Sequence, residues 1–350
     1  MATLRITTIA GARPQFVKAA AMSRAFAASG QFEERLVHTG QHYDYQMSEA
    51  FFRELDLPAP AVNLGIANLP HGAMTGRMIE GIEADLMARR PDAVLVYGDT
   101  NSTLAGALAA AKLAIPAIHV EAGMRSGRAD VPEEINRIVA DHVCGLLLCS
   151  SEAALQHLAK EGLAAKARLI GDLMYDVTLF ASGRVEASGI RARLRLAAGG
   201  YSLLTLHRAE NLGAPARLAR LVAYAREAGQ GQPIIFPVHP RTGAFLKAES
   251  IALDEITLVE PLGYFDFHAL IADAAQVMTD SGGVQKEAYF HARPCITLRD
   301  ETEWTETIDA GWNRLWTQPA YSTPRRSIPD YGNGHAAREA VSAIAAFLAA

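Results

Sequence analysis

Short apolar segments that end in polar turns, each followed by a helical segment, recur along this chain of 350 residues. The clearest example is the strand-like segment 93–97, followed by the turn 98–101, a helix over about 102–113 and a second apolar strand that ends on Glu121. This order is typical of βαβ units and parallel sheets. The carboxyl ends of such strands meet at one edge of the sheet, where open α/β sheets bind ligands.

A second unit with the same order lies in the other half of the chain. A strand over 276–279 leads into the turn 280–283, a helix over 284–291 and a strand over 295–298. Because a single hydrophobic core rarely exceeds about 300 residues, we expect two Rossmann-like, doubly wound α/β domains. We place residues 1–170 together with a C-terminal helix, 336–350, in the first domain, and residues 171–335 in the second.

Composition excludes several classes of protein. Half of the residues are apolar and 20% are charged, which is ordinary for a globular protein, and the net charge of −5 argues against broad nucleic-acid binding. The three cysteines show no CxxC spacing, so we expect neither a disulfide framework nor a cysteine metal site. No leader-like segment precedes the first strand, and Lys112 and Pro116 interrupt the longest apolar stretch. We therefore expect a cytoplasmic protein that does not enter the membrane.

Two turns are candidate anion sites. Segment 11–18 (GARPQFVK) follows the first strand and offers Arg13 and Lys18. The turn 280–283 carries Ser281, Gly282 and Gly283 to a helix N-terminus, whose free N–H groups attract phosphate, with Glu287 one turn further on. No GxGxxG or P-loop pattern is present, so we expect no dinucleotide cofactor. The simpler alternative is a pair of tight turns with solvated charges.

Carboxylates also follow strands. Asp99 and Glu121 come after neighbouring strands and can point into one crevice, where burial would adapt them to acid–base chemistry. Glu133 and Glu134 follow Pro132, which is also the pattern of an ordinary helix start. Each acid taken alone is as well explained by a helix cap or a salt bridge.

Two further strand ends carry a histidine and an arginine. His207 precedes Arg208 after one apolar strand, and His239 and Arg241 follow another. These pairs would balance an anionic substrate, although an isolated histidine at a strand end is often structural. No HxH or HExxH pattern is present, so we expect no metal.

Taken in order, these motifs resemble the non-hydrolysing UDP-N-acetylglucosamine 2-epimerases. The resemblance covers nearly the whole chain and rests on several segments at suitable spacing, namely GARPQFVK, TGQHYDYQMS, VYGDTNSTLAGALAA, HVEAGMRSG, PEEINR, TLHRAEN, PVHPRT, TDSGGVQKEA and RDETEW. It implies a glycosyltransferase-B-like fold with the active site in the cleft between the domains, a homodimer, a UDP-sugar substrate and no cofactor or metal.

The resemblance also implies roles for individual residues. Asp99, Glu121 and Glu133 match the acid–base carboxylates, and His207 matches a residue near the leaving diphosphate. The positions that match nucleotide, phosphate or other substrate contacts are Arg13, Lys18, His239, Arg241, Phe267 (beside the uracil), Ser281, Gly282, Gly283, Glu287 and Trp304.

One position departs from the best-known members, which read Glu-Arg-Pro-Glu where this chain has Glu303 to Glu306. Trp304 therefore replaces an arginine that contacts substrate. Together with the GARPQF, TGQHYDYQMS and RDETEW segments, this resembles the branch that acts on UDP-2,3-diacetamido-2,3-dideoxyglucuronic acid. The alternative is that Trp304 only packs its own loop.

Three other functions are compatible with parts of this pattern. A glycosyltransferase of the same fold would need an acceptor groove, and a hydrolysing epimerase would release UDP and a free sugar. A non-enzymatic sugar-nucleotide sensor would need the phosphate-binding residues but not the carboxylates, whereas this chain has both.

Overall fold

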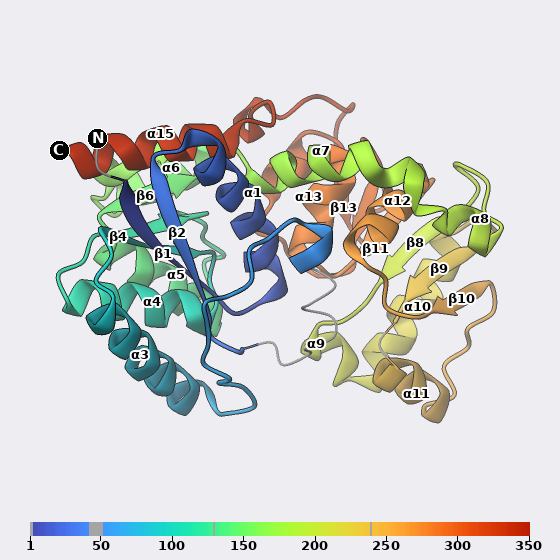
Figure 1. The fold of residues 1–350 in the computed structure, drawn as a ribbon. Coiled ribbons are helices and arrows are strands. Elements are labelled where there is room, and N and C mark those ends of the chain that lie inside the picture. Colours follow the sequence, from blue (N-terminus) through green and yellow to red (C-terminus); the bar gives the residue numbers. More distant parts are fainter. Residues whose placement is uncertain (1–2, 42–51, 129, 239) are drawn as a thin grey trace. The chain divides into compact units, whose positions relative to one another are not determined.

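The computed structural model describes residues 3–41, 52–128, 130–238 and 240–350, and the chain divides into two compact units (Figure 1). The first unit is Met1–Val177 with Pro329–Ala350, and the second is Thr178–Ile328. The chain thus passes between units within a helix, α7 (Leu173–Val185), somewhat beyond the boundary placed at 170/171 from the sequence.

The first unit is built on a seven-stranded sheet in the order β3-β2-β1-β4-β5-β6-β7, in which every pair is parallel. The central strands are buried along their whole length because helices cover both faces, as parallel sheets require. The strands are β1 (Leu4–Ala10), β2 (Phe32–His38), β3 (Val62–Asn63), β4 (Ala93–Tyr97), β5 (Ala117–Val120), β6 (Leu146–Cys149) and β7 (Ala167–Leu169). Its helices are α1 (Arg13–Ser29), α3 (His71–Ala88), α4 (Asn101–Lys112), α5 (Pro132–Val143), α6 (Glu152–Lys160) and α15 (Ala336–Ala349), with short 3-10 turns at Ala164–Lys166 and Pro329–Tyr331.

The second unit has a six-stranded parallel sheet in the order β10-β9-β8-β11-β12-β13. Its strands are β8 (Ser202–Thr205), β9 (Ile234–Pro237), β10 (Ile256–Val259), β11 (Gln276–Thr279), β12 (Cys295–Thr297) and β13 (Asn313–Leu315). Its helices are α8 (Ile190–Leu194), α9 (Ala209–Leu212), α10 (Pro215–Ala228), α11 (Pro240–Ala248), α12 (Tyr264–Asp273), α13 (Gly282–Phe290) and α14 (Thr305–Asp309), with a 3-10 turn at Glu186–Ser188.

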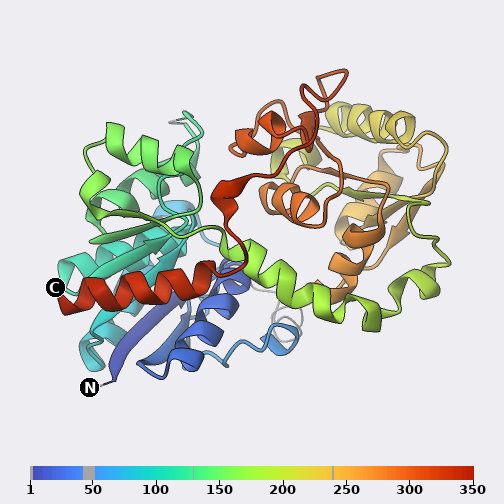
Figure 2. The ribbon, with the colours of Figure 1, turned by 90° about the horizontal axis from the view of Figure 1, so that it is seen from above.

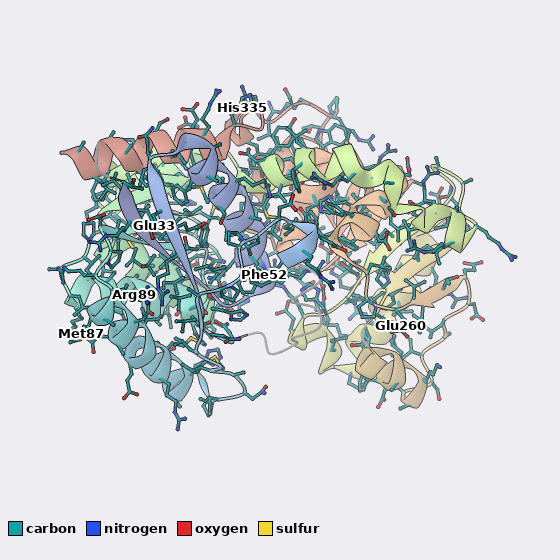
Figure 3. All side chains as sticks on the ribbon, viewed as in Figure 1. Glu33, Phe52, Met87, Arg89, Glu260 and His335 are labelled. Carbon is teal, nitrogen blue, oxygen red and sulfur yellow. The ribbon has the colours of Figure 1, made fainter. Side chains whose placement is uncertain are left out.

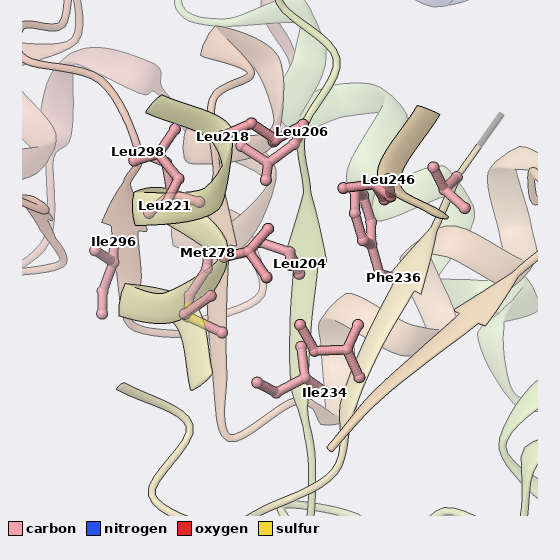
Figure 4. Close-up of a cluster of buried hydrophobic side chains, with 14 residues drawn as sticks. Leu204, Leu206, Leu218, Leu221, Ile234, Phe236, Leu246, Met278, Ile296 and Leu298 are labelled. Carbon is pink, nitrogen blue, oxygen red and sulfur yellow. The ribbon is translucent and has the colours of Figure 1, made fainter. Parts of the chain in front are cut away.

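One face of the second sheet packs against α10 (Figure 4). Leu218 and Leu221 of the helix lie three residues apart and so share one face, which meets Leu204 of β8 and Met278 of β11 in the same buried cluster. This apolar layer fixes the strands whose ends carry the polar turns.

Both sheets change strand order at a defined place. In the first sheet the chain runs outward from β1 to β2 and β3, and then returns to place β4 on the other side of β1. The second sheet repeats this arrangement at β8 and β11. Open α/β sheets bind ligands beyond the carboxyl ends of the strands at such switch points. The α/β fold class predicted from the sequence is confirmed.

The C-terminal segment returns to the first unit, where α15 packs along α1 (Figure 2). The carboxylate of Asp176 accepts hydrogen bonds from the backbone N–H groups of Ala336 (3.0 Å) and Ala337 (2.8 Å). It thereby satisfies two donors at the start of a helix that has no side-chain cap of its own.

We expect Asp176→Ala to lower the free energy of unfolding by about 1–2 kcal/mol, because α15 loses its capping carboxylate. Urea denaturation measures the change. Glu33→Ala is the control, since Glu33 is exposed on β2 of the same unit (Figure 3), and it should change stability by less than about 0.5 kcal/mol. Equal effects of the two substitutions would contradict a capping role.

Candidate active site

Two tight turns position the carboxylates at the edge of the first sheet. Tyr97 of β4 pairs with Val120 of β5, so the residues that follow them, Gly98–Asp99 and Glu121, emerge side by side. Gly98 has a φ of 62° and Glu121 a φ of 65°. The left-handed conformation is unfavourable for a residue with a side chain, so Glu121 is a strained position of the kind that gathers at functional sites.

Lys18 forms an ion pair with Glu121. The lysine is on α1 and is almost fully buried, and its ammonium group meets Oε2 of a carboxylate whose side chain is 14% exposed. A Cβ atom on Gly98 would lie 3.2 Å from the same Glu121 oxygen, so the turn needs glycine for space as well as for φ. The structure thus places Lys18 against a carboxylate at the end of β5.

Arg137 bridges two acids. Its guanidinium group donates to Asp99 Oδ2 at 2.5 Å and to Glu134 Oε2 at 2.9 Å. Burial raises the pKa of Asp99, and the negative charge of Glu121 raises it further, while Arg137 and Lys18 act in the opposite direction. The Asp99 side chain nevertheless remains 31% exposed, so it can still meet a ligand.

The adjacent acids Glu133 and Glu134 have different surroundings. Glu134 is buried and accepts hydrogen bonds from the backbone N–H groups of Ser126 and Gly127, which fixes the loop before α5. Glu133 lies in the first turn of α5 and is exposed. Glu134 therefore stabilises the loop before α5, whereas Glu133 is accessible to a ligand.

A buried hydrogen-bond network supports the turn at Gly98. His119 of β5 donates through Nε2 to the carbonyl oxygen of Gly98 at 2.7 Å, and its Nδ1 lies 2.7 Å from Asp141. Asp141 also accepts from the N–H of Gly123 and pairs with Arg125. This network, in which His119 and Asp141 are fully buried, fixes the two turns that carry Asp99 and Glu121.

In the second unit, Asp280 organises the switch point between β8 and β11. Its buried carboxylate accepts from the N–H groups of His207 and Arg208, from Nδ2 of Asn211 at 2.9 Å, and meets His207 Nδ1 at 3.0 Å. Burial acts to raise the pKa of Asp280, but these donors and the His207 ring outweigh it and hold the pKa below its usual value. The His207 side chain is 62% exposed and thus available to a ligand.

The start of α13 is the candidate phosphate site. Ser281 caps this helix by accepting from Val284 N, so α13 begins at Gly282 rather than at Val284 as the sequence predicted. A Cβ atom on Gly282 would lie 2.8 Å from Glu303 Oε1 and 3.0 Å from Trp304 Nε1. Only glycine leaves room at this helix start for those side chains.

Trp304 is buried, and the Lys286 ammonium lies 3.7 Å from the centre of its ring. Within the part of the chain that the structure describes, the indole Nε1 has no hydrogen-bond partner. A buried N–H donor beside a helix N-terminus is suited to an anion, because both groups attract negative charge. Nearby, Arg299 donates to Glu303 at 2.8 Å.

The other positions named from the sequence are placed as follows. Arg13 is the first residue of α1 and is half-buried, Phe267 is buried on α12, and Glu287 is buried on α13. Arg241 lies in α11, and His239 is outside the described residues, as is most of the TGQHYDYQMS segment. Among the described residues there is no cluster of histidine, cysteine or acidic side chains suited to a metal, and none of the helices is long and apolar enough to cross a membrane.

Comparison with known proteins decides the family. The profile of the UDP-N-acetylglucosamine 2-epimerase family matches residues 24–345. This chain belongs to that family. It is similar to the UDP-2,3-diacetamido-2,3-dideoxy-D-glucuronate 2-epimerase of Pseudomonas aeruginosa, with 43% identity over 99% of both chains. It is also similar to the UDP-N-acetylglucosamine 2-epimerase of Methanocaldococcus jannaschii, with 41% identity over 89% of this chain and 88% of that one.

Solved structures of the epimerase family have the same fold. A crystal structure of the M. jannaschii enzyme in complex with UDP-GlcNAc and UDP has a TM-score of 0.89 and 38% identity over 98% of this chain and all of that one. A Staphylococcus aureus protein solved with UDP also has a TM-score of 0.89, at 28% identity over 99% of this chain and 97% of that one.

Several residues of this epimerase's candidate site were not assigned from sequence. Arg137, His119 and Asp280 each contact a turn at the carboxyl edge, but only Arg137 gave a local signal, as a basic residue one turn after Glu133 and Glu134. Their partners are distant in sequence, so single-sequence patterns do not reveal them.

We expect Asp280→Asn to lower the free energy of unfolding by about 1–3 kcal/mol at neutral pH, because buried donors lose a charged acceptor. The pKa of Asp280 is lower in the folded chain than its unfolded value of about 3.9, so the ionised carboxylate stabilises the fold above that value. This contribution is lost as the pH falls through the folded pKa.

Urea denaturation at pH 7 and at stepwise lower pH measures the difference between wild type and Asp280→Asn, which should shrink as the solution becomes acidic. Asp254→Asn is the control, since Asp254 forms an exposed ion pair with Arg226 and should change stability by less than about 1 kcal/mol. A difference that grows in acid would contradict this account of Asp280.

Proposed function

We propose that this chain inverts carbon 2 of a UDP-linked N-acetylamino sugar without hydrolysing the sugar–UDP bond. Full-length similarity to proteins named as 2-epimerases supports this function. The observation that carries the chemical argument is the pairing of Asp99 and Glu121 with buried cations at neighbouring strand ends.

Epimerisation at carbon 2 faces a chemical obstacle, because no carbonyl group lies beside that carbon and its proton is not acidic. Elimination removes the obstacle. As the C1–O bond breaks, its electron pair leaves with the UDP phosphate, a carboxylate takes the C2 proton, and a C1=C2 double bond forms. Re-addition of UDP at C1, with protonation of C2 from the opposite face, gives the epimer. The site must therefore supply acid–base groups and stabilise a departing diphosphate.

We assign the acid–base groups to the first unit. Asp99 has a raised pKa and partial exposure, which suits a group that carries a proton. Glu121 is paired with the Lys18 ammonium, which favours its carboxylate form, and Glu133 is exposed on the first turn of α5. Carboxylates in different surroundings can take opposite roles in one reaction.

We assign the nucleotide to the second unit. The start of α13, with Ser281, Gly282 and Gly283, provides N–H donors and the positive end of a helix dipole for the diphosphate. His207 at the end of β8 is exposed and near it in the same switch point. Glu287 would bind the ribose and Phe267 the uracil, while Arg241 and His239 would add charge to the phosphate. Arg13, at the start of α1 in the first unit, is a candidate phosphate contact by the family resemblance alone.

We further infer that the substrate is UDP-2,3-diacetamido-2,3-dideoxyglucuronate. The P. aeruginosa relative of that name covers the whole chain at 43% identity. Trp304, where the best-known members carry arginine, is buried with its indole N–H directed at the start of α13. In the structure Arg299 is paired with Glu303. To bind a sugar carboxylate, its guanidinium group would have to contact Glu303 and the sugar at the same time.

The acid–base assignment predicts the effect of three substitutions. Asp99→Asn, Glu121→Gln and Glu133→Gln should each lower turnover by about two to four orders of magnitude, because each removes a proton-transfer group. The dissociation constant for UDP should change by less than about threefold, since these groups face the sugar. Glu134→Gln is the comparison for Glu133: it should reduce stability, because its carboxylate binds the Ser126 loop, and should lower turnover less than Glu133→Gln, because it reaches Asp99 only through Arg137.

Turnover is followed by proton NMR of the C2 configuration, and UDP binding by calorimetry. Substitutions that abolish UDP binding while leaving turnover largely intact would show that these carboxylates bind the nucleotide instead.

Trp304 provides the test of the sugar. Wild type should use the diacetamido-glucuronate at least about tenfold more efficiently than UDP-N-acetylglucosamine, and Trp304→Arg should narrow that ratio by about tenfold, because pocket shape and donor charge both change. Trp316→Phe is the control, since the Trp316 indole already donates to Asp300. The measurement is kcat/KM on both UDP-sugars. A wild type that prefers UDP-N-acetylglucosamine, with Trp304→Arg unchanged, would contradict the sugar assignment but not the 2-epimerase reaction.

A further inference from the structure

Two histidines, one fully buried and one half-buried, lie behind the residue that we assign to the ribose. His268 is on α12 and is fully buried, Glu287 is buried on α13, and His291 follows the end of α13. His268 Nδ1 lies 2.9 Å from His291 Nε2, and His268 Nε2 lies 3.5 Å from Glu287 Oε1. The three side chains thus lie in a row, in the order His291, His268 and Glu287.

The geometry of this row holds the His268 ring between two polar side chains. Burial, together with the electrostatic effect of His268 and Arg293, lowers the pKa of His291 to about 3, so its ring is neutral and carries a single N–H. Among the described residues, His268 Nε2 makes no hydrogen bond, and it faces Glu287 Oε1 at 3.5 Å. A ring nitrogen that faces a carboxylate must carry the hydrogen, because two lone pairs would repel each other.

The 2.9 Å contact between the two rings holds one hydrogen, which one nitrogen donates and the other accepts. His291 in this way fixes the orientation of the His268 ring, whose Nε2 then faces Glu287 Oε1. The Tyr264 ring, with its centroid 4.1 Å from that of His268, restricts the imidazole plane.

The Glu287 carboxylate, which His268 Nε2 faces, lies where a nucleotide would extend. Gly283 and Glu287 are four residues apart on α13 and therefore share one face of the helix, about one turn from each other. A diphosphate at the helix start would bring the ribose hydroxyls to Glu287. Phe267, which we assign to the uracil, is adjacent to His268 on α12, so His268 connects the helix at the base to the helix at the ribose.

We propose that the His291–His268 pair positions the Glu287 carboxylate to accept hydrogen bonds from the ribose hydroxyls of the nucleotide. This proposal rests on the proposed function, because it needs a uridine nucleotide at α13. Both histidines act through Glu287 and do not touch the reacting sugar, so they set nucleotide affinity and leave the proton-transfer steps unchanged.

The experiment compares binding of UDP with binding of 2′,3′-dideoxyuridine diphosphate, which lacks both ribose hydroxyls, by calorimetry on the full chain. Wild type should bind UDP about tenfold more tightly, and Glu287→Gln should remove most of that difference. His291→Leu removes the hydrogen-bond partner of His268 Nδ1 and should reduce the difference to about twofold by weakening UDP alone. His291→Gln keeps a side-chain amide that can pair with His268 and should restore most of it.

Turnover provides the second readout, in which His291→Leu should raise KM about fivefold and leave kcat within about twofold. His268→Gln tests the residue between His291 and Glu287 by the same measurements, because its side-chain amide can donate to Glu287. Circular dichroism establishes that each variant is folded, and His291, which is only partly buried, is the substitution that the fold tolerates most readily.

The possible outcomes distinguish an error in the proposed function from an error in the proposal for the histidine pair. If wild type does not bind UDP, the proposed function is wrong, and if Glu287→Gln keeps the full difference between the ligands, the ribose assignment is wrong. If Glu287→Gln removes the difference but His291→Leu retains it, or weakens both ligands equally, the histidine pair is only structural and the proposal is overturned.

Discussion

The ion pairs between Lys18 and Glu121 and between Arg137 and Asp99 are the interactions on which the first unit's site depends. Two carboxylates at adjacent strand ends would repel each other strongly in a partly buried setting. Each instead meets a cation delivered by a helix of the same unit. The pairs keep both acids at the sheet edge, and the unequal surroundings that result allow the two acids to differ in their affinity for a proton. A left-handed Glu121 and a left-handed Gly98 are the backbone conformations that this arrangement requires.

In the second unit a buried acid shapes the end of a strand instead of facing a ligand. There the buried acid, Asp280, faces inward and binds the backbone of His207 and Arg208, so its charge shapes a strand end. The donors left at the switch point are the start of α13, the exposed His207 ring and the buried Trp304 indole N–H. One unit thus presents paired carboxylates and the other presents N–H donors. Elimination of a diphosphate from a sugar requires both kinds of group.

The fold could be predicted well from the sequence because parallel α/β units produce short-range sequence patterns. The bounds of β4, β11 and α15 agree with the expected segments, since apolar runs, turn residues and helix caps are all short-range signals. It could not predict which face of α5 is buried. In that helix Ile135 and Ile138 are exposed while Glu134, Arg137 and Asp141 are buried, the reverse of the usual amphipathic pattern. There Arg137 and Asp141 bind the turns that follow β4 and β5, and partners so distant in sequence are not visible in local spacing. For the same reason the Lys18–Glu121 pair and the His268–His291 contact emerged only from the structure.

In elimination and re-addition, the C2 proton leaves the sugar and a proton returns from a group that exchanges with solvent. The most direct measurement is turnover of the UDP-sugar in deuterated water, followed by proton NMR and mass spectrometry of the epimer. Product formed early in the reaction should carry deuterium at C2, because the carboxylate that protonates the C1=C2 intermediate has exchanged with solvent. Product that retains its original C2 hydrogen through complete conversion would contradict elimination and re-addition through Asp99, Glu121 and Glu133.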